Sequence, residues 1–339
     1  MSRTLSVLLG TAIAVSAVTA AQAQELNLYS SRHYDTDERL YSDFTDITGI
    51  AINRIEGNAD ELLARMEAEG ENSPADVFLT VDTSRLQRAA DMGVLQPVDS
   101  DVLAERIPSN LRDDDNLWFG FSQRARIIFY DTEAVETPPQ TYLDLADPAY
   151  EGMICIRSST NTYNQTLLAS IIENHGEEVA RDWATGIVAN MARDPQGGDT
   201  DQLRGLASGE CSIAVSNTYY FARAIRTEVE GLGEAERETI GWVFPDQGGN
   251  GAHVNLSGGG VAAHAPNREA AVAFLEYLAS EQAQVYFSSG NDEYPVVEGV
   301  PLAESVTALG EWEADDVDLA AVAENIPLAQ QIFNEVGWE

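Results

Sequence analysis

Alternating strand and helix patterns in the N-terminal part of the sequence constrain the fold of this chain more than any other feature. Apolar runs at 26–29, 50–55 and 76–79 are predicted strands, and each precedes a segment with apolar residues at helical spacing. Strands that alternate with helices form a parallel sheet that helices cover on both faces. Ligands bind such sheets beyond the carboxyl ends of the strands, so the residues that follow each strand are candidates for a site.

Polar residues before the first two helices are suited to capping their N-termini. Asp35 is the predicted cap of the helix that follows the first strand. Asn58 is the predicted cap of the next helix, and Glu61 follows three residues later, as in a capping box. A helical pattern at 319–333 contains Pro327, which we expect to break that helix.

The length of the chain predicts two lobes. About 315 residues remain once an export signal is excluded, which is more than a single core usually organises. A long predicted strand at 118–130 is typical of a segment that crosses between lobes, and a strand at 254–262 is expected to return to the first lobe. We therefore predict a first and a second lobe with these boundaries: 24–122 plus about 248–300, and 123–247 plus about 301–339.

The N-terminus has the pattern of a secretory signal peptide. Arg3 precedes an apolar stretch at 5–20, and Ala21-Gln22-Ala23 has the small-residue spacing of a cleavage site. We predict that 1–23 is a signal peptide cleaved near Ala23 and that the mature protein is periplasmic. No second long apolar segment follows, so we do not expect a membrane-embedded protein.

The charge balance excludes several classes of partner. The chain carries 19 basic and 56 acidic residues, which gives a formal net charge of −37. A field of that sign repels nucleic acid and anionic membranes. We therefore expect no nucleic-acid partner, and we interpret most of the acidic residues as a solvated surface that keeps the protein soluble.

Local signatures of an enzyme are absent from the sequence. It contains no G-x-S-x-G or H-E-x-x-H motif, and the glycine-rich runs 248–251 and 258–260 lack the residues of a phosphate-binding loop. We interpret both runs as turns or hinges. A catalytic triad or zinc site would need nearly all of the histidines, at positions 33, 175, 253 and 264. We predict that the protein is not an enzyme, with a secreted hydrolase as a remote alternative.

Cys155 and Cys211 are the two cysteines of the chain. In an exported protein, two cysteines favour a disulfide over free thiols. The predicted bond would join the strand before Ser158 to the strand before Tyr219. It would therefore hold two candidate site loops in one lobe.

Two adjacent tyrosines, Tyr219 and Tyr220, follow the apolar run 211–215, which is a predicted buried strand. In a regular helix, neighbouring side chains point about 100° apart and cannot enter one core together. At a strand-to-helix junction, two neighbouring rings can converge on one point. This spacing makes the pair a candidate site.

Four phenols lie at predicted carboxyl ends of strands: Tyr34 in the first lobe, and Tyr163, Tyr219 and Tyr220 in the second. A free phenol has a pKa of about 10, so at neutral pH it binds a metal only if a strong, hard Lewis acid displaces its proton. Fe³⁺ is such an ion and prefers anionic oxygen. The sequence therefore predicts a ferric site that the two lobes share.

Four phenolates around Fe³⁺ leave a net charge of about −1, and buried excess charge calls for a nearby cation. Arg124 and Arg126 on the long crossing strand are candidates for that cation. For Arg124, the predicted role beside the metal ligands and an ordinary interlobe salt bridge remain equally open.

Three motifs in order resemble ferric-iron-binding proteins of iron ABC importers, of the FutA and FbpA types. They are the segment Tyr-Ser-Ser-Arg-His-Tyr at 29–34, the loop from Ile-Arg-Ser-Ser at 156–159 to Tyr-Asn-Gln at 163–165, and the run Ser-Asn-Thr-Tyr-Tyr-Phe at 216–221. The resemblance covers essentially the whole mature chain. It implies an α/β, two-lobed periplasmic-binding-protein fold of type II, with mixed sheets flanked by helices and an interlobe hinge.

The resemblance also implies function and ligands. It identifies Tyr34, Tyr163, Tyr219 and Tyr220 as iron-binding tyrosines and His33 as a position that is a ligand in some members. It implies capture of Fe³⁺ by hinge closure and delivery to an ABC permease with its ATPase, by a protein that we expect to be a monomer. A synergistic anion or water could complete the metal shell. The same fold binding an organic anion, phosphonate or sugar is the first alternative.

Overall fold

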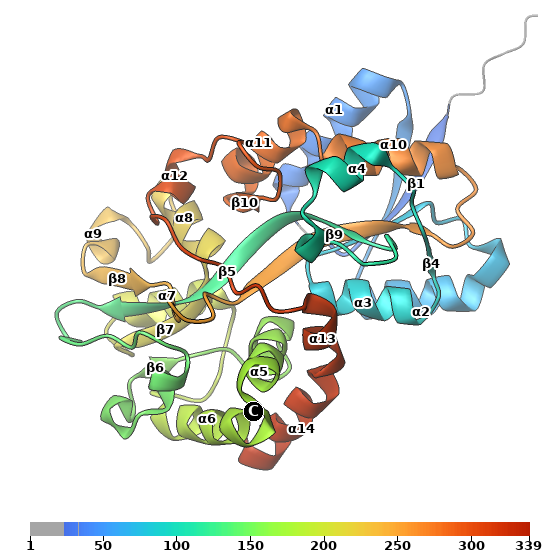
Figure 1. The fold of residues 1–339 in the computed structure, drawn as a ribbon. Helices are drawn as coiled ribbons and strands as arrows, with labels where there is room; N and C mark the ends of the chain where they lie inside the picture. Colours follow the sequence, from blue (N-terminus) through green and yellow to red (C-terminus); the bar gives the residue numbers. More distant parts are fainter. Residues whose placement is uncertain (1–23, 33) are drawn as a thin grey trace, which may run out of the picture.

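The computed structural model describes residues 24–32 and 34–339, and two α/β lobes joined by long strands form the molecule (Figure 1). His33 and the predicted signal peptide lie outside the described residues. The mixed sheet and flanking helices confirm the predicted fold class. The names "first lobe" and "second lobe" refer to the boundaries predicted from the sequence, and these boundaries stay a prediction.

The sheet of the first lobe begins with three strands in parallel. β1 (Glu25–Ser30) lies between β2 (Ala51–Glu56) and β3 (Val77–Thr80), parallel to both. β9 (Val254–Ala262) then pairs with β3 in the antiparallel direction, and β4 (Leu95–Gln96) pairs with β9. The strand that returns to the first lobe is thus present as predicted.

β5 (Phe119–Asp131) belongs to both lobes. Its first half pairs with β9 and with the short β10 (Tyr294–Pro295), and its second half pairs with β7 (Ile213–Asn217) and β8 (Ile240–Val243). The long crossing strand is therefore confirmed. Along the path of neighbouring strands the order is β2-β1-β3-β9-β5-β7-β6, where β6 is Ile154–Cys155.

Helices flank both parts of the sheet (Figure 1). In the first lobe they are α1 (Glu38–Thr48), α2 (Ala59–Glu69), α3 (Thr83–Asp91), α4 (Asp101–Arg106), α10 (Arg268–Leu278) and α11 (Glu281–Asn291). In the second they are α5 (Thr162–His175), α6 (Glu177–Asn190), α7 (Asp199–Ala207), α8 (Thr218–Arg226), α9 (Glu234–Arg237), α12 (Glu304–Thr307), α13 (Leu319–Glu324) and α14 (Ile326–Val336). Short 3-10 turns lie at Asp35–Asp37, Gly70–Asn72, Ser109–Leu111, Leu143–Ala146 and Pro148–Tyr150.

Two of the predicted helix boundaries are confirmed and one is wrong. The Asn58 side chain accepts a hydrogen bond from the Asp60 amide at 2.9 Å and caps α2. Pro327 lies in the first turn of α14, so the C-terminal helical pattern is broken as predicted. Asp35, in contrast, lies inside a 3-10 turn and caps no helix, because the chain makes this extra turn before α1 begins.

The glycine run 258–260 is not a turn, because it lies inside the buried strand β9. A Cβ atom on Gly259 would lie 2.6 Å from the Phe78 carbonyl oxygen, and one on Gly258 would lie 2.4 Å from the Phe119 carbonyl oxygen. Neighbouring backbones thus approach this strand more closely than a side chain allows. Backbone packing, rather than a hinge, accounts for the three glycines.

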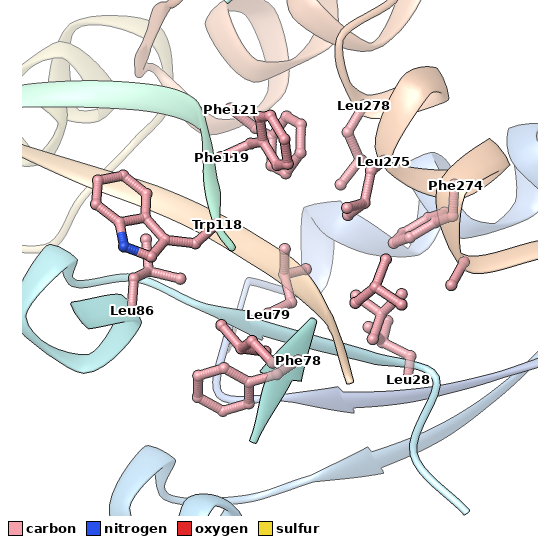
Figure 2. Packing of buried hydrophobic residues seen from close by; sticks show 14 of the residues in the cluster. Leu28, Phe78, Leu79, Leu86, Trp118, Phe119, Phe121, Phe274, Leu275 and Leu278 are labelled. Carbon is pink, nitrogen blue, oxygen red and sulfur yellow. The ribbon is translucent and has the colours of Figure 1, made fainter. Parts of the chain in front are cut away.

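The buried apolar residues form separate cores. One cluster contains Leu28, Phe78 and Phe274, and Figure 2 shows part of it. Two other clusters lie on β5, β7 and their helices, around Trp183 and around Phe129. This grouping separates the core beside β1 and β3 from the two cores beside β7. α13 crosses it, because Leu319 joins the first cluster while Val322 joins the second.

Cys155 and Cys211 form a disulfide with a Cα–Cα distance of 5.8 Å, which confirms the predicted pairing. The bond lies in the second lobe, between β6 and the residues before β7. Within the described ranges, no helix has the length and apolar character that crossing a membrane requires.

Candidate metal centre

Tyr219 and Tyr220 lie in the first turn of α8, directly after β7 ends at Asn217. Their rings stack, with centroids 4.1 Å apart and an interplanar angle of 30°. Tyr219 is fully buried, whereas Tyr220 is partly exposed. The strand-to-helix junction therefore places two neighbouring phenols against each other rather than on separate faces of the helix.

Tyr163 lies in the first turn of α5, not in the preceding loop where the sequence predicted it. Its hydroxyl is 3.5 Å from the hydroxyl of Tyr219. β6 and β7 are parallel neighbours, so the helices that follow them begin at the same edge of the sheet. This topology brings together two tyrosines that are 56 residues apart in the sequence.

Tyr34 reaches the same place from the first lobe. It precedes the 3-10 turn after β1, and its ring meets the Tyr219 ring edge-on at a centroid distance of 6.0 Å. Its hydroxyl donates a hydrogen bond to the Glu293 carboxylate, with an oxygen–oxygen distance of 3.4 Å. The structure thus brings all four predicted tyrosines into one cluster between the lobes.

Three of the four tyrosines belong to the first turns of helices, Tyr163 in α5 and Tyr219 and Tyr220 in α8. The N-terminus of a helix carries a partial positive charge that stabilises nearby anions. Phenolate forms of these side chains therefore gain electrostatic support from the backbone as well as from side chains.

Arginine side chains lie over the tyrosine rings. The guanidinium carbon of Arg32 is 4.8 Å from the centroid of Tyr34, and those of Arg124 and Arg157 are 5.5 and 5.6 Å from the centroid of Tyr163. Arg223 lies 5.5 Å from the Tyr219 centroid and 5.9 Å from that of Tyr220. Such cations attract aromatic faces and would stabilise phenolate still more.

The sequence predicted only Arg124 among these arginines. Arg32, Arg157 and Arg223 each lie within a motif or within a few residues of one of the tyrosines, and this proximity was the available signal. It was weak, because which side chain covers a ring depends on how the helices and strands pack.

Arg124 and Arg126 have different environments although both are buried. Arg124 donates a hydrogen bond to the Ser257 hydroxyl at 3.0 Å and, within the described part of the chain, forms no salt bridge. Arg126 pairs with Asp199 at 3.2 Å and also donates to Asn164 at 2.7 Å. Arg126 thus forms a salt bridge within the second lobe, whereas Arg124 faces Tyr163.

Burial raises the pKa of Tyr34, Tyr219 and Tyr220. The pKa of Tyr34 lies well above its ordinary value because of burial and then the Glu293 carboxylate, and that of Tyr219 because of burial and then Tyr163. Burial, followed by Asp199, also raises the pKa of Tyr220. These phenols therefore keep their protons until a strong Lewis acid displaces them.

Other common metal ligands do not gather in the described residues. No group of three or more His, Cys, Asp or Glu side chains there is arranged to hold a metal ion. The donor set that this site offers is phenolic oxygen, which suits a hard trivalent ion better than a soft divalent one.

A cavity of about 520 Å³ opens beside Tyr163 and Tyr220 and has walls from both lobes. Ser31, Asn58 and Arg85 line it from the first lobe, and Arg157 and Thr162 from the second. A larger cavity of about 710 Å³ lies on the second lobe beside Arg193 and Arg204, and none of the four tyrosines lines it. We assign the candidate site to the interlobe cavity because two of the four clustered phenols, Tyr163 and Tyr220, line it.

Two α/β lobes joined by crossing strands, with a polar cavity between them, are typical of solute-binding proteins. Residues 72–313 match the family model described as "Bacterial extracellular solute-binding protein", and the chain belongs to this family.

Individual relatives of the chain are named for iron uptake or ferric-iron binding. The chain is 49% identical over 322 residues to "Iron uptake protein A1" of Synechocystis sp., covering 95% of this chain and 89% of the relative. It is 25% identical over 319 residues to the "Major ferric iron-binding protein" of Neisseria meningitidis, covering 92% of this chain and 93% of the relative. The resemblance to FutA-type and FbpA-type proteins is thereby confirmed.

Solved structures agree with these relatives. Trichodesmium FutA, described as a complex with iron and citrate ligands, superposes with a TM-score of 0.87 at 48% identity and covers 93% of this chain and 100% of its own. The ferric binding protein from Campylobacter jejuni has a TM-score of 0.86 at 39% identity, with coverage of 93% and 100%. The relatives named here are iron-uptake or iron-binding proteins, and none is named as an enzyme.

Proposed function

We propose that this protein captures Fe³⁺ through Tyr34, Tyr163, Tyr219 and Tyr220 and delivers it to an ABC permease. The observation that carries the proposal is the convergence of four phenols from both lobes, with Tyr163 and Tyr219 hydroxyls 3.5 Å apart. Relatives named for iron uptake and ferric binding support iron as the cargo, and the name of a Serratia marcescens relative supports a periplasmic location. Binding and transport of a metal ion requires no catalysis.

The charges around the site fit a ferric phenolate cluster. Four phenolates and one Fe³⁺ give a net charge of about −1, and an uncompensated buried charge is unfavourable. The guanidinium of Arg124, fully buried and without a salt bridge among the described residues, supplies a compensating charge beside Tyr163. Arg124 therefore acts beside the ligands and not as one of them.

The division of the tyrosines between lobes supports a capture mechanism. Open lobes present Tyr163, Tyr219 and Tyr220 on one wall, and Fe³⁺ displaces their protons. Tyr34 then joins from the first lobe as the hinge closes, which shields the ion from water. Acid favours release by reprotonating the phenolates, and reduction to Fe²⁺ weakens binding because the less charged ion gains less from phenolate oxygen.

Several finer points belong to the same proposal. His33, the residue before Tyr34, is a possible further ligand, and an anion or water completes the shell from the interlobe cavity. The protein acts as a monomer whose partners are the permease and its ATPase. Sequencing the N-terminus of the exported protein tests the signal peptide, and a mature chain that starts at Gln24 is expected.

Visible absorption of the purified protein mixed with ferric citrate tests the proposed cargo. Phenolate-to-iron charge transfer gives a broad coloured band, and a Tyr219→Phe, Tyr220→Phe double variant should lose it. The matched control is Tyr29→Phe, which removes a buried phenol that donates to Glu69 outside the cluster. A colourless wild-type protein, or a band that persists in the double variant, would rule out this ferric site. Calorimetric binding of an organic anion, phosphonate or sugar without iron would then favour the alternative cargo.

A further inference from the structure

Glu293 is a completely buried carboxylate directly beside Tyr34. It lies between α11 and β10, and β10 pairs with β5 through Tyr294 and Pro295. The Ser122 hydroxyl on β5 donates to one carboxylate oxygen at 2.6 Å. The chain therefore holds this carboxylate between the crossing strands and the loop that carries Tyr34.

The same carboxylate lies beside a buried arginine, Arg32. Arg32 lies 3.7 Å from it and also forms a two-point ion pair with Asp37, at 2.6 and 3.0 Å. Asn291, two residues before Glu293, donates to Asp37 at 2.8 Å. Arg32 thus offsets the buried negative charge, and the whole group has few alternative arrangements because each member is bonded to another.

A serine connects Glu293 to the cation of the site. The Ser257 hydroxyl on β9 donates to Glu293 at 3.4 Å, while it accepts a hydrogen bond from Arg124 at 3.0 Å. Arg124 in turn faces the Tyr163 ring. One carboxylate is therefore connected to Tyr34 of the first lobe directly and to Tyr163 of the second lobe through Ser257 and Arg124.

We propose that Glu293 is a positioning residue of the ferric site, which holds the Tyr34 hydroxyl in place until Fe³⁺ displaces its proton and, through Ser257, keeps Arg124 directed at Tyr163. The proposal rests on the proposed function, because it assigns a role toward the iron-binding tyrosines. Glu293 contacts Tyr34, a proposed metal ligand, and its two oxygens accept hydrogen bonds from the hydroxyls of Tyr34, Ser122 and Ser257. Partners of this kind fix the geometry of the groups that touch the metal.

Glu293→Gln tests the role with a side chain of the same shape and no charge. We expect a shifted charge-transfer band and a change in ferric affinity of about 10- to 100-fold, measured by competition with citrate. Glu293→Asp, which restores the charge on a shorter stem, should recover part of both. The position of the band is the decisive readout, because a general loss of stability would reduce the amount of coloured protein without moving its absorption.

Glu69→Gln is the matched control. Glu69 accepts a hydrogen bond from Tyr29 at 3.1 Å, so this variant makes the same change at a tyrosine–glutamate contact outside the site. It should leave the ferric affinity and the band unchanged. Wild-type affinity and an unmoved band in Glu293→Gln, or an equal change in Glu69→Gln, would overturn the positioning role.

Ser257→Ala provides a second variant in case Glu293→Gln does not fold. It removes the connection to Arg124 without changing any charge, and we expect a loss of ferric affinity of about 10-fold. No change in Ser257→Ala would also contradict the proposal. A colourless wild-type protein would instead refute the proposed function, and the role of Glu293 would fall with it, so the two failures are distinguishable.

Discussion

Arg226, at the C-terminal end of α8, forms a two-point ion pair with Asp292, the residue beside Glu293. The two nitrogen–oxygen distances are 2.9 and 2.8 Å, and Arg226 also donates to the Gly290 carbonyl at the end of α11. By the predicted boundaries this pair crosses between the lobes. The C-terminal end of α8, the helix that carries Tyr219 and Tyr220, is thus bonded to Asp292. The next residue, Glu293, contacts Tyr34.

Arg226→Gln should lower the free energy of unfolding. Removing one partner from a fully buried ion pair costs about 3–5 kcal/mol, and we expect about 2 kcal/mol here because the Arg226 side chain is 33% exposed. Denaturant unfolding measures the change. Arg181→Gln is the control, because Arg181 is equally exposed but its partners Glu177 and Glu335 lie at the surface, and its loss should be about 0.5 kcal/mol. Equal losses in the two variants would contradict the expectation.

Arg124→Gln should weaken ferric binding more than it weakens folding. The variant removes the cation over Tyr163, and we expect a loss of affinity of about 10- to 100-fold. Competition with citrate measures the affinity, and thermal unfolding checks the fold. Arg88→Gln removes an exposed arginine of the first lobe and should leave the affinity unchanged. Unaltered affinity in Arg124→Gln would exclude its role beside the ligands.

Reduction of the Cys155–Cys211 bond should destabilise the protein. The bond closes a loop with a sequence separation of 56, and the entropy of such a loop corresponds to about 4 kcal/mol. Thermal unfolding with and without a reductant that reaches the buried bond measures the loss. A Cys155→Ala, Cys211→Ala variant should unfold like the reduced protein and respond to reductant no further.

Iron binding should release protons. The pKa values of Tyr34 and Tyr219 are raised, chiefly by burial, so both phenols are protonated at neutral pH and must lose protons to bind a metal. Ferric affinity should therefore fall as the pH falls. Titration in weakly buffered solution measures one proton for each phenol that binds, and the Tyr219→Phe, Tyr220→Phe variant should release fewer. Binding without proton release would refute phenolate ligation.

Alkaline solution should destabilise the iron-free protein through other tyrosines. Burial raises the pKa of Tyr41 and of Tyr277 to about 12 in the folded state. The unfolded value is about 10, so their contribution to stability is complete below that pH and is lost as the pH rises toward about 12. Thermal unfolding across this range measures the loss. Tyr41→Phe should show a shallower dependence on pH, and an unchanged dependence would contradict the assignment.

The sequence predicted the elements whose signal is local. The apolar periodicity around 118–130 predicted β5 because a strand buried in both lobes needs a long apolar run. Tyr219 and Tyr220 were predicted to meet because a strand end precedes them, and their rings do stack. The disulfide between Cys155 and Cys211 followed from an exported chain with two cysteines.

The sequence failed where distant segments determine the structure. Gly259 was predicted to lie in a turn because a run of three glycines has a flexible backbone. The backbone that approaches Gly259 belongs to Phe78, which is 181 residues away in the sequence, so no local pattern indicates the contact. Glu293 is one of many acidic residues, and only its burial between β5 and the Tyr34 loop distinguishes it. Packing of this kind cannot be read from spacing along the chain.

Because β5 supplies hydrogen-bonded partners to both β9 and β7, the two lobes have no independent sheets. The long strand also runs through both halves of the molecule without an intervening loop (Figure 1). No single cut of the chain can then yield a complete half, since either fragment would keep an unpaired sheet edge. Limited proteolysis should accordingly leave the folded molecule nicked but associated, and it should yield no stable isolated lobe.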